Sequence, residues 1–237
     1  TTTYTVTVSD NGCESTAQVT VNVNPAPIAD AGFDQTICEG ETTTLSASGG
    51  NSYNWSSGQS GANISVSPAT TTTYTVTVTD NGCESTAQVT VNVNPAPIAD
   101  AGFDQTICEG ESTTLSAAGG SSYNWSSGQS GANISVSPST TTTYTVTVTD
   151  SGCESTAQVT VNVNPAPIAD AGIDQTICEG EFATLSASGG TFYDWSDGQG
   201  GSTITVSPAT TTTYTVTVSD NGCESTAQVT VNVNPAP

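Results

Sequence analysis

Cysteine is the residue type in this 237-residue chain that is best suited to covalent chemistry, and its seven copies occur in two recurring contexts. One context is "TICEGE", where two carboxylates follow the thiol, and the other is "DNGCES" or "DSGCES", directly after turn residues. The first context holds Cys38, Cys108 and Cys178, and the second holds Cys13, Cys83, Cys153 and Cys223. These thiols could form disulfides. Zinc would need clustered Cys or His ligands, and the chain contains no His.

The charge composition excludes several function classes. The chain contains 22 Asp plus Glu, no Lys or Arg, and a formal net charge of -22. Because it cannot neutralise phosphates, we exclude nucleic acid and anionic membrane surfaces as direct partners. The usual catalytic bases, oxyanion ligands and phosphate ligands are also missing, so we expect no enzyme. The acidic charge either keeps a β-rich surface soluble or attracts cations, and both interpretations stay open.

A repeat of about 70 residues organises the chain, because "NPAPIADAG" begins at residues 24, 94 and 164. We expect domains over residues 28–94, 98–164 and 168–234, with linkers 25–27, 95–97, 165–167 and 235–237. Two prolines in each linker should make it extended and semi-rigid. Residues 1–24 correspond to 71–94 and are expected to be the C-terminal hairpin of a truncated repeat. A window cut from a longer array explains this hairpin, and donor-strand exchange between subunits is the alternative.

The hydrophobic pattern predicts strands throughout. In "YTVTVTDNGCESTAQVTVNV", Tyr74, Val76 and Val78 alternate with threonines, and Asp80-Asn81-Gly82 supplies a turn. Upstream, "TTTLSASGG", "SYNWSS" and "ANISVSP" are typical of further short strands, and no helical period occurs. The fold class is therefore all-β, with tandem immunoglobulin-like sandwiches arranged end to end. One tryptophan per repeat should fill each core: Trp55, Trp125 and Trp195.

The stretches "ADAGFDQTICEGETTTLSASGG", "YNWSSG" and "TTTTYTVTVTDNGC" resemble the tandem Ig-like, PKD-like repeats of large Bacteroidota surface adhesins. The resemblance covers essentially the whole chain. PKD-like domains often carry a "WDFGDG"-like stretch, to which only "YDWSDGQGG" of the third repeat comes near. The resemblance implies a secreted, cell-surface adhesin or filament. Such modules serve as stalks in proteins of many roles.

Strand direction in such a sandwich bears on the cysteine pairing. The strand ending at Cys38 should lie parallel to the last strand, which begins near Cys83, so the two cysteines lie at opposite ends. They would be about 20 Å apart, whereas a disulfide needs Cα atoms within about 7 Å. We therefore favour bonds between domains, Cys38–Cys153 and Cys108–Cys223, and partners outside the window for Cys13, Cys83 and Cys178. A Cys38–Cys83 bond within one domain and free thiols are the alternatives.

Carboxylates and hydroxyls at the domain ends suggest two further kinds of site. Carboxylates near the joints could share a calcium ion, for which the candidates are Asp30, Asp34, Asp80, Asp100, Asp104 and Asp150. Solvated turn carboxylates are the alternative. Glycans could be attached at Thr71, Thr72 and Thr73, or at the sequons that begin at Asn54 and Asn63.

These observations together predict an extracellular structural array, a stalk or filament of a surface adhesin, stiffened by disulfides and rigid linkers. Its partners would be neighbouring repeats of the same chain and other copies in a filament, with attached glycans. The alternative is a ligand-binding or glycan-binding adhesive module. A binder should present exposed aromatic residues, for which Phe182, Phe192 and Tyr193 of the third repeat are the candidates. Variation between repeats is the simpler account of these residues.

Overall fold

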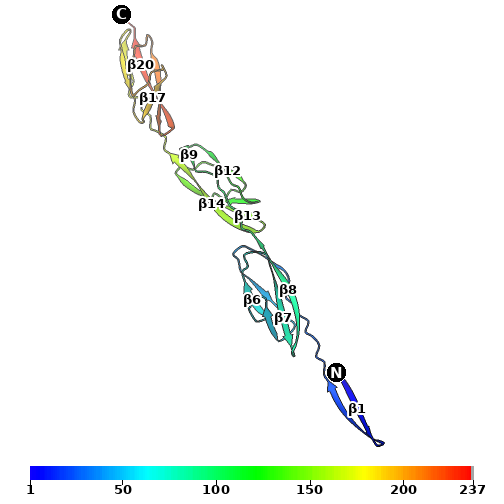
Figure 1. The fold of residues 1–237 in the computed structure, drawn as a ribbon. Coiled ribbons are helices and arrows are strands. Elements are labelled where there is room, and N and C mark those ends of the chain that lie inside the picture. The colour runs from blue at the N-terminus through cyan, green and yellow to red at the C-terminus, as the bar shows by residue number, and fades with distance from the viewer. Residues whose placement is uncertain (236–237) are drawn as a thin grey trace. The chain divides into compact units, whose positions relative to one another are not determined.

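The computed structural model describes residues 1–235, and these residues form only strands, turns and irregular segments (Figure 1). The all-β prediction is therefore confirmed for this part of the chain. The chain divides into two compact units, residues 1–96 with 151–153 and the remainder from residue 97 onward. No helix in the described part is long and apolar enough to cross a membrane.

The first unit begins with a two-stranded antiparallel hairpin, β1 (Thr2–Asp10) and β2 (Cys13–Val21). Asn11 and Gly12 connect the strands, with φ angles of 47° and 85°. Positive φ at both central residues is the geometry of the tight hairpin turn that suits the twist of paired strands. Asn-Gly is the sequence that best tolerates it. The turn residues therefore fix the register, with Asp10 opposite Cys13.

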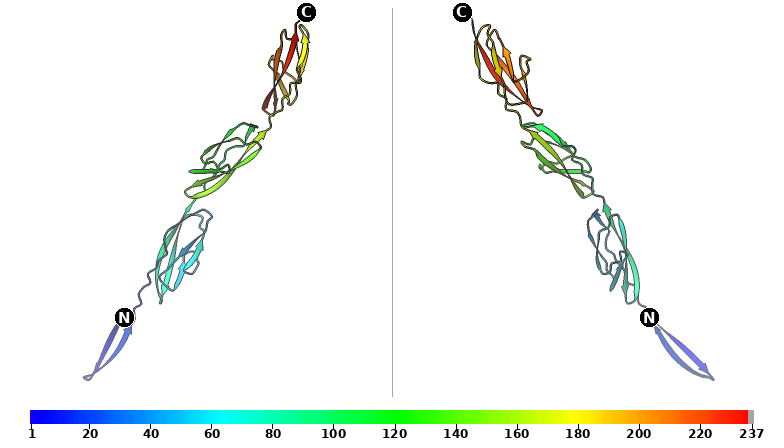
Figure 2. Two further views of the ribbon diagram at one scale, coloured as in Figure 1. Left: turned by 180° about the vertical axis from the view of Figure 1, so that it is seen from behind. Right: turned by 60° about the vertical axis from the view of Figure 1, so that its left-hand side comes forward.

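The first complete sandwich follows in the same unit and consists of six strands. They are β3 (Gln35–Cys38), β4 (Thr43–Ser46), β5 (Ser52–Trp55), β6 (Asn63–Val66), β7 (Thr72–Asp80) and β8 (Cys83–Asn94). One sheet has the order β3-β8-β7-β5, and β4 pairs with β6 in the other. Figure 2 shows the sandwich from two further sides. The long hairpin β7–β8 is the centre of the larger sheet.

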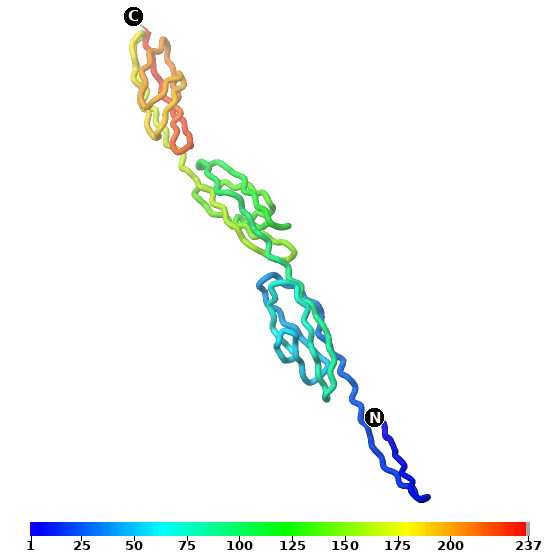
Figure 3. Tube along the Cα trace, in the orientation of Figure 1, coloured from blue at the N-terminus to red at the C-terminus, as the bar shows by residue number. Residues whose placement is uncertain are grey.

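The second unit holds two more sandwiches with the same topology, whose traces can be followed in Figure 3. The second sandwich has β9 (Gln105–Cys108), β10 (Thr113–Ser116), β11 (Ser122–Trp125), β12 (Asn133–Val136), β13 (Thr142–Asp150) and β14 (Cys153–Asn164). The third has β15 (Gln175–Cys178), β16 (Ala183–Ser186), β17 (Phe192–Trp195), β18 (Thr203–Val206), β19 (Thr212–Asp220) and β20 (Cys223–Asn234).

The core of each sandwich comes from the alternating apolar residues of these strands. In the first sandwich Tyr74, Val76 and Val78 are buried, as the alternation predicts, and pack with Leu45 and Trp55. The indole Nε1–H of Trp55 donates to the carbonyl of Gly61 at 3.0 Å, so the ring buries no unpaired donor. The equivalent Trp125 and Trp195 are also buried in their cores.

Each repeat begins with a segment that packs closely on a glycine. Gly49 has φ of 107°, and a Cβ at that position would lie 1.9 Å from the carbonyl oxygen of Ile28. Only glycine permits both the backbone angle and the close approach. The end of the linker is held nearby, because the amide of Ala29 donates to Ser85 Oγ at 3.1 Å. Residues 236 and 237 of the expected 235–237 linker lie outside the described residues.

Candidate functional site at the disulfide-bonded joints

Strand direction places the two kinds of cysteine at opposite ends of each sandwich. β3 pairs with β8 in parallel, with Cys38 opposite Asn94, the last residue of β8. Cys83 is the first residue of this 12-residue strand. At about 3.3 Å per residue the two cysteines are separated by about 35 Å. The predicted parallel pairing is confirmed, and the alternative Cys38–Cys83 bond is wrong.

Disulfides instead connect consecutive sandwiches. Cys38 is bonded to Cys153 and Cys108 to Cys223, each with Cα atoms 5.6 Å apart. These are the two pairs predicted from the sequence. Each bond joins the end of the first strand of one sandwich to the first residue of the last strand of the next. Among the described residues, Cys13, Cys83 and Cys178 are free thiols.

We call the residues around these bonds the bonded joints: Cys38, Asn94 and Ser151–Cys153 in one, and Cys108, Asn164 and Asn221–Cys223 in the other. In both, the asparagine that ends the preceding sandwich contacts the next sandwich through its side-chain amide and its backbone carbonyl. Asn94 Nδ2 donates to the carbonyl of Ser151 at 2.9 Å, and its own carbonyl oxygen lies 3.8 Å from Cys153 Sγ. Asn164 makes the same contacts with Asn221 and Cys223.

The hairpin β1–β2 and the first sandwich form a third joint with the same contacts but no disulfide, which we call the open joint: Asn24, Asn81 and Cys83. Asn24 Nδ2 donates to the carbonyl of Asn81 at 3.1 Å. The thiol of Cys83 lies 3.5 Å from the carbonyl oxygen of Asn24. The amide contacts therefore form whether or not the bond is present.

The second carboxylate of "TICEGE", that of Glu41, binds the backbone of the joint. Glu41 Oε2 accepts from the amide of Cys38 at 2.9 Å, and the amide of Glu41 donates back to the Cys38 carbonyl at 3.0 Å. The amide of Glu39 donates to the carbonyl of Asn94 at 2.9 Å. This turn holds Cys38 at the end of β8, in the position from which it reaches Cys153.

Most of the carboxylates proposed for calcium accept hydrogen bonds in the structure. Asp30 Oδ1 accepts from the amide of Gly32 at 2.9 Å, and Asp34 Oδ1 from the amide of Thr90 at 2.7 Å. Asp80 Oδ2 accepts from a neighbouring asparagine amide at 3.0 Å. Asp100 and Asp104 repeat the first two bonds, and Asp150 ends β13. Within residues 1–235 no group of three or more His, Cys, Asp or Glu side chains is arranged to hold a metal ion, and calcium binding at these carboxylates stays a prediction.

The candidate glycosylation residues lie at the surface, and their occupancy stays a prediction. Asn54 and Asn63 are exposed in β5 and β6, and Asn63 Oδ1 accepts from Ser46 Oγ at 2.7 Å. Thr71 and Thr73 are exposed and Thr72 is half-buried.

The third sandwich contains the aromatic residues that are the candidates for a ligand-binding surface. Phe182 and Phe192 are exposed, at 73% and 70%. Tyr193 is not exposed like the two phenylalanines, because its hydroxyl donates to the carbonyl of Gly190 at 2.6 Å and its ring packs against the core.

The same sandwich contains a tyrosine with a shifted pKa. Burial, and secondarily the carboxylate of Asp197, raise the pKa of Tyr214.

The chain matches no family model and no curated protein. Among solved structures, it is similar to the I-band fragment I67–I69 from titin, with 11% identity, a TM-score of 0.50, and coverage of 90% of this chain and all of that one. An E-to-A variant of titin I67–I69 is similar at 12% identity and the same TM-score, covering 89% of this chain and all of that one. These similarities show the fold. The chain consists of tandem immunoglobulin-like sandwiches, three of them complete.

Proposed function

We propose that this chain is an extracellular structural array, a stalk or filament of a bacterial surface adhesin, in which disulfides between neighbouring sandwiches carry tension. The observation that carries the proposal is the placement of both disulfides between sandwiches and not within them. A bond within a sandwich would stabilise one domain, whereas a bond across a joint restrains the joint. The resemblance to Bacteroidota surface adhesin repeats supports the bacterial cell surface as the location.

The overlap of the two disulfides supports a mechanical role. The shortest covalent path runs from residue 1 to Cys38, crosses to Cys153, returns to Cys108, crosses to Cys223 and continues to residue 237. At about 3.5 Å per residue this path extends to about 340 Å, against about 830 Å for the reduced chain. An oxidised chain in which every sandwich had unfolded would therefore extend to less than half the length of the unfolded reduced chain.

Pulling single molecules by their two ends tests this role. We expect the oxidised chain to stop at about 340 Å and the reduced chain to extend to about 830 Å. The variants Cys38→Ser/Cys153→Ser and Cys108→Ser/Cys223→Ser form a matched pair, because each should stop at about 430 Å. An oxidised chain that extends as far as the reduced chain would contradict the tension-bearing role.

Oxidation state in the cell tests the location, because structural disulfides persist outside the cytosol. Cells that make the protein should be treated with a membrane-impermeant alkylating reagent, and the protein digested without reduction. We expect peptides linked through Cys38–Cys153 and Cys108–Cys223, and removal of the protein by protease added to intact cells. Alkylated thiols at all seven cysteines, or complete protection from the protease, would rule out the extracellular array.

A ligand-binding or glycan-binding adhesive module is the second candidate, favoured by the exposed Phe182 and Phe192. Both aromatic rings stand where the second repeat carries serine, Ser112 and Ser122. Phe182→Ser/Phe192→Ser should abolish retention on a glycan array if the third sandwich binds carbohydrate. Ser112→Phe/Ser122→Phe is the control for non-specific adhesion by exposed rings.

A further inference from the structure

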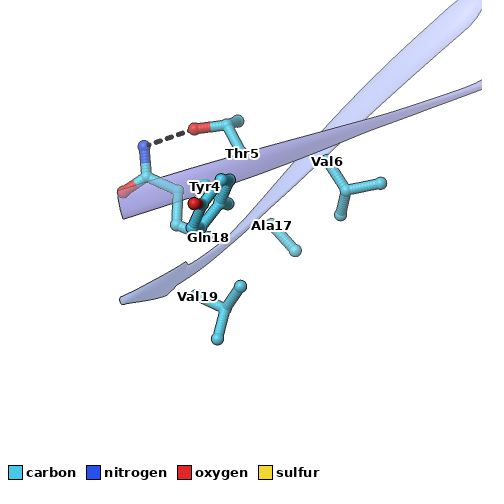
Figure 4. A pocket seen from close by; sticks show the side chains of 6 residues that line it. All are labelled: Tyr4, Thr5, Val6, Ala17, Gln18 and Val19. Carbon is cyan, nitrogen blue, oxygen red and sulfur yellow. Dashed lines mark hydrogen bonds between the residues drawn. The ribbon is translucent and has the colours of Figure 1, made fainter. Parts of the chain in front are cut away.

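The hollow on the hairpin β1–β2 is an uncovered core face. Figure 4 shows Tyr4, Val6 and Val19 around it, together with the Thr5–Gln18 hydrogen bond of 3.3 Å. The same alternating residues of the equivalent hairpins are buried in each complete sandwich, where the strands of the upstream part of the repeat cover them. This hollow therefore repeats the core pattern and indicates no ligand.

A hollow on the second sandwich differs, because all six strands of that sandwich are present and its core is covered. It lies where the loop before β9 faces β10, and its volume is about 200 Å³. The residues that line it are all uncharged: 101–103, Gln105 and 114–116. Pockets for drug-sized ligands begin at about 300 Å³, so this hollow has room for one small ring.

Phe103 forms one wall of this hollow and is 90% exposed. Hydrogen bonds fix the loop on both sides of the ring. Asp100 Oδ1 accepts from the amide of Gly102 at 2.8 Å. Asp104 Oδ1 accepts from the amide of Thr160, in β14, at 2.8 Å. Binding residues are typically carried on loops that a rigid scaffold positions, and Phe103 fits this description because its backbone is held while its ring lies in solvent.

All three repeats place a large apolar side chain at this position, but only two place an aromatic ring there. Phe33 is 93% exposed in the first repeat, and Ile173 is 85% exposed in the third. The first repeat carries the same residue types as the second at every position that lines the hollow, and the third differs among these positions only at Ile173. The chain therefore contains its own control for the ring.

Two polar groups of the hollow have no hydrogen-bond partner within residues 1–235. They are Oε1 of Gln105 and the hydroxyl of Thr114. The side chain of Gln105 uses only its Nε2, which donates to the carbonyl of Phe103 at 3.0 Å. An acceptor and a hydroxyl are therefore available to a ligand beside the exposed ring.

The equivalent glutamine of the first sandwich has a different arrangement. The Thr43 hydroxyl donates to Gln35 Oε1, and Gln35 Nε2 donates to the carbonyl of Thr44 at 3.0 Å. Both bonds connect Gln35 to β4, whereas Gln105 makes neither bond to β10. The same side chain thus has two arrangements, and the one in the second sandwich leaves its oxygen free.

These groups favour a neutral sugar as the ligand. An aromatic face packs on the apolar C–H face of a pyranose ring, and an amide oxygen and a hydroxyl bond to its hydroxyl groups. An anionic sugar would need cationic partners, and the chain has no Lys, Arg or His. A cationic ligand would need carboxylates, and none is among the lining residues. A second copy of the chain would bring the same net charge of -22, which opposes association.

We propose that this hollow, which we call the Phe103 site, binds one pyranose ring of a neutral polysaccharide. The ring of Phe103 stacks on the sugar, Gln105 Oε1 accepts from one sugar hydroxyl, and the Thr114 hydroxyl bonds to a second. The first sandwich contains the same side chains and provides a second site when Gln35 turns away from β4. The third sandwich lacks the ring and provides none. This inference goes beyond the structural role and does not depend on it, because a stalk bears load with or without attached polysaccharide.

Retention of the full oxidised chain on immobilised cellulose, β-1,3-glucan, mannan and galactan tests the proposal. We expect retention on at least one of them, with two sites per chain when its soluble fragments are titrated. Phe33→Ile/Phe103→Ile installs the residue of the third repeat and should weaken binding by about tenfold or more. Phe182→Ser/Phe192→Ser removes the other exposed rings and should leave binding unchanged. No retention on any of the four, or equal retention of Phe33→Ile/Phe103→Ile and the wild type, would overturn the proposal.

A second pair of variants tests the hydroxyl. Thr44→Val/Thr114→Val removes the hydroxyl from both sites at nearly constant shape, and the loss of one hydrogen bond should lower the affinity about fivefold. Thr36→Val/Thr106→Val makes the same change at exposed threonines outside the hollow and should have no effect. Equal losses from the two pairs would contradict the assigned contact.

Two further measurements separate the neutral sugar from other occupants. Polygalacturonate carries a carboxylate on each ring, so we expect no retention on it, and retention equal to that on the neutral polymer would overturn the choice of ligand. Sedimentation without sugar should show no association that depends on the ring. Association that Phe33→Ile/Phe103→Ile abolishes would assign the hollow to a second copy of the chain. None of these results alters the disulfides between sandwiches, so the proposed function stands or fails separately.

Discussion

The hairpins β1–β2 and β19–β20 have one sequence and two environments. Their registers agree, with Tyr4 opposite Val19 and Tyr214 opposite Val229, and Asn11 and Asn221 both have φ of 47°. Yet Val6 is 57% exposed whereas Val216 is fully buried. Strand pairing and turn geometry are therefore set by the local sequence, and burial is set by the strands that the upstream part of a repeat supplies.

Truncation of a valine side chain should give the largest difference in unfolding free energy between the two hairpins. Val216→Ala removes two buried methyl groups and leaves a cavity, so we expect the third sandwich to lose about 2 kcal/mol of unfolding free energy. Val6→Ala is the same substitution in the same local sequence on an exposed face, and it should change the unfolding free energy of no sandwich. Denaturant unfolding of both variants measures the difference. Similar losses from both would mean that β1–β2 is covered in solution.

A smaller effect should come from the turns, because the second sandwich departs from the shared sequence there. Ser151 has φ of 50° where Asn81 and Asn221 stand in the other sandwiches. Asparagine tolerates this left-handed conformation better than serine. We expect Ser151→Asn to stabilise the second sandwich by about 0.5 kcal/mol and Asn221→Ser to destabilise the third by a similar amount.

Asn11→Ser is the control for the turn variants, since it makes the same change in a hairpin without a core. Thermal unfolding of the complete sandwiches should not respond to it. If Asn221→Ser also proved silent, the turn would contribute to register alone and not to the stability of the folded sandwich.

Much of the fold was predictable because its local signals agree. The alternation of Tyr74, Val76 and Val78 gives the hairpin and its buried face, and parallel pairing of the strand that ends at Cys38 follows from the sandwich topology. The disulfide pairs followed from strand direction and length. Calcium binding stays a prediction, and the sequence did not reveal the backbone partners of the candidate carboxylates: Asp34 accepts a hydrogen bond from the amide of Thr90, 56 residues away. The open joint was not predictable, because the contacts of Asn24 with Asn81 and Cys83 join residues 57 and 59 positions apart in the sequence.

The smallest effect should appear in alkaline solution and concerns Tyr214, the buried counterpart of the exposed Tyr4. Burial, with a contribution from the Asp197 carboxylate, raises the pKa of Tyr214 above the value it has in the unfolded chain. The folded state therefore retains its proton where the unfolded state has lost it. Stability from this group is complete below a pH of about 10 and declines as the pH rises further. The midpoint of thermal unfolding of the third sandwich should fall over that range, and Tyr214→Phe should remove this part of the fall. Asp197→Ser installs the residue that the first two repeats carry, Ser57 and Ser127, and should make the decline shallower. An unchanged decline in Asp197→Ser would assign the whole shift to burial by residues 168–210, which is the environment that β1–β2 lacks.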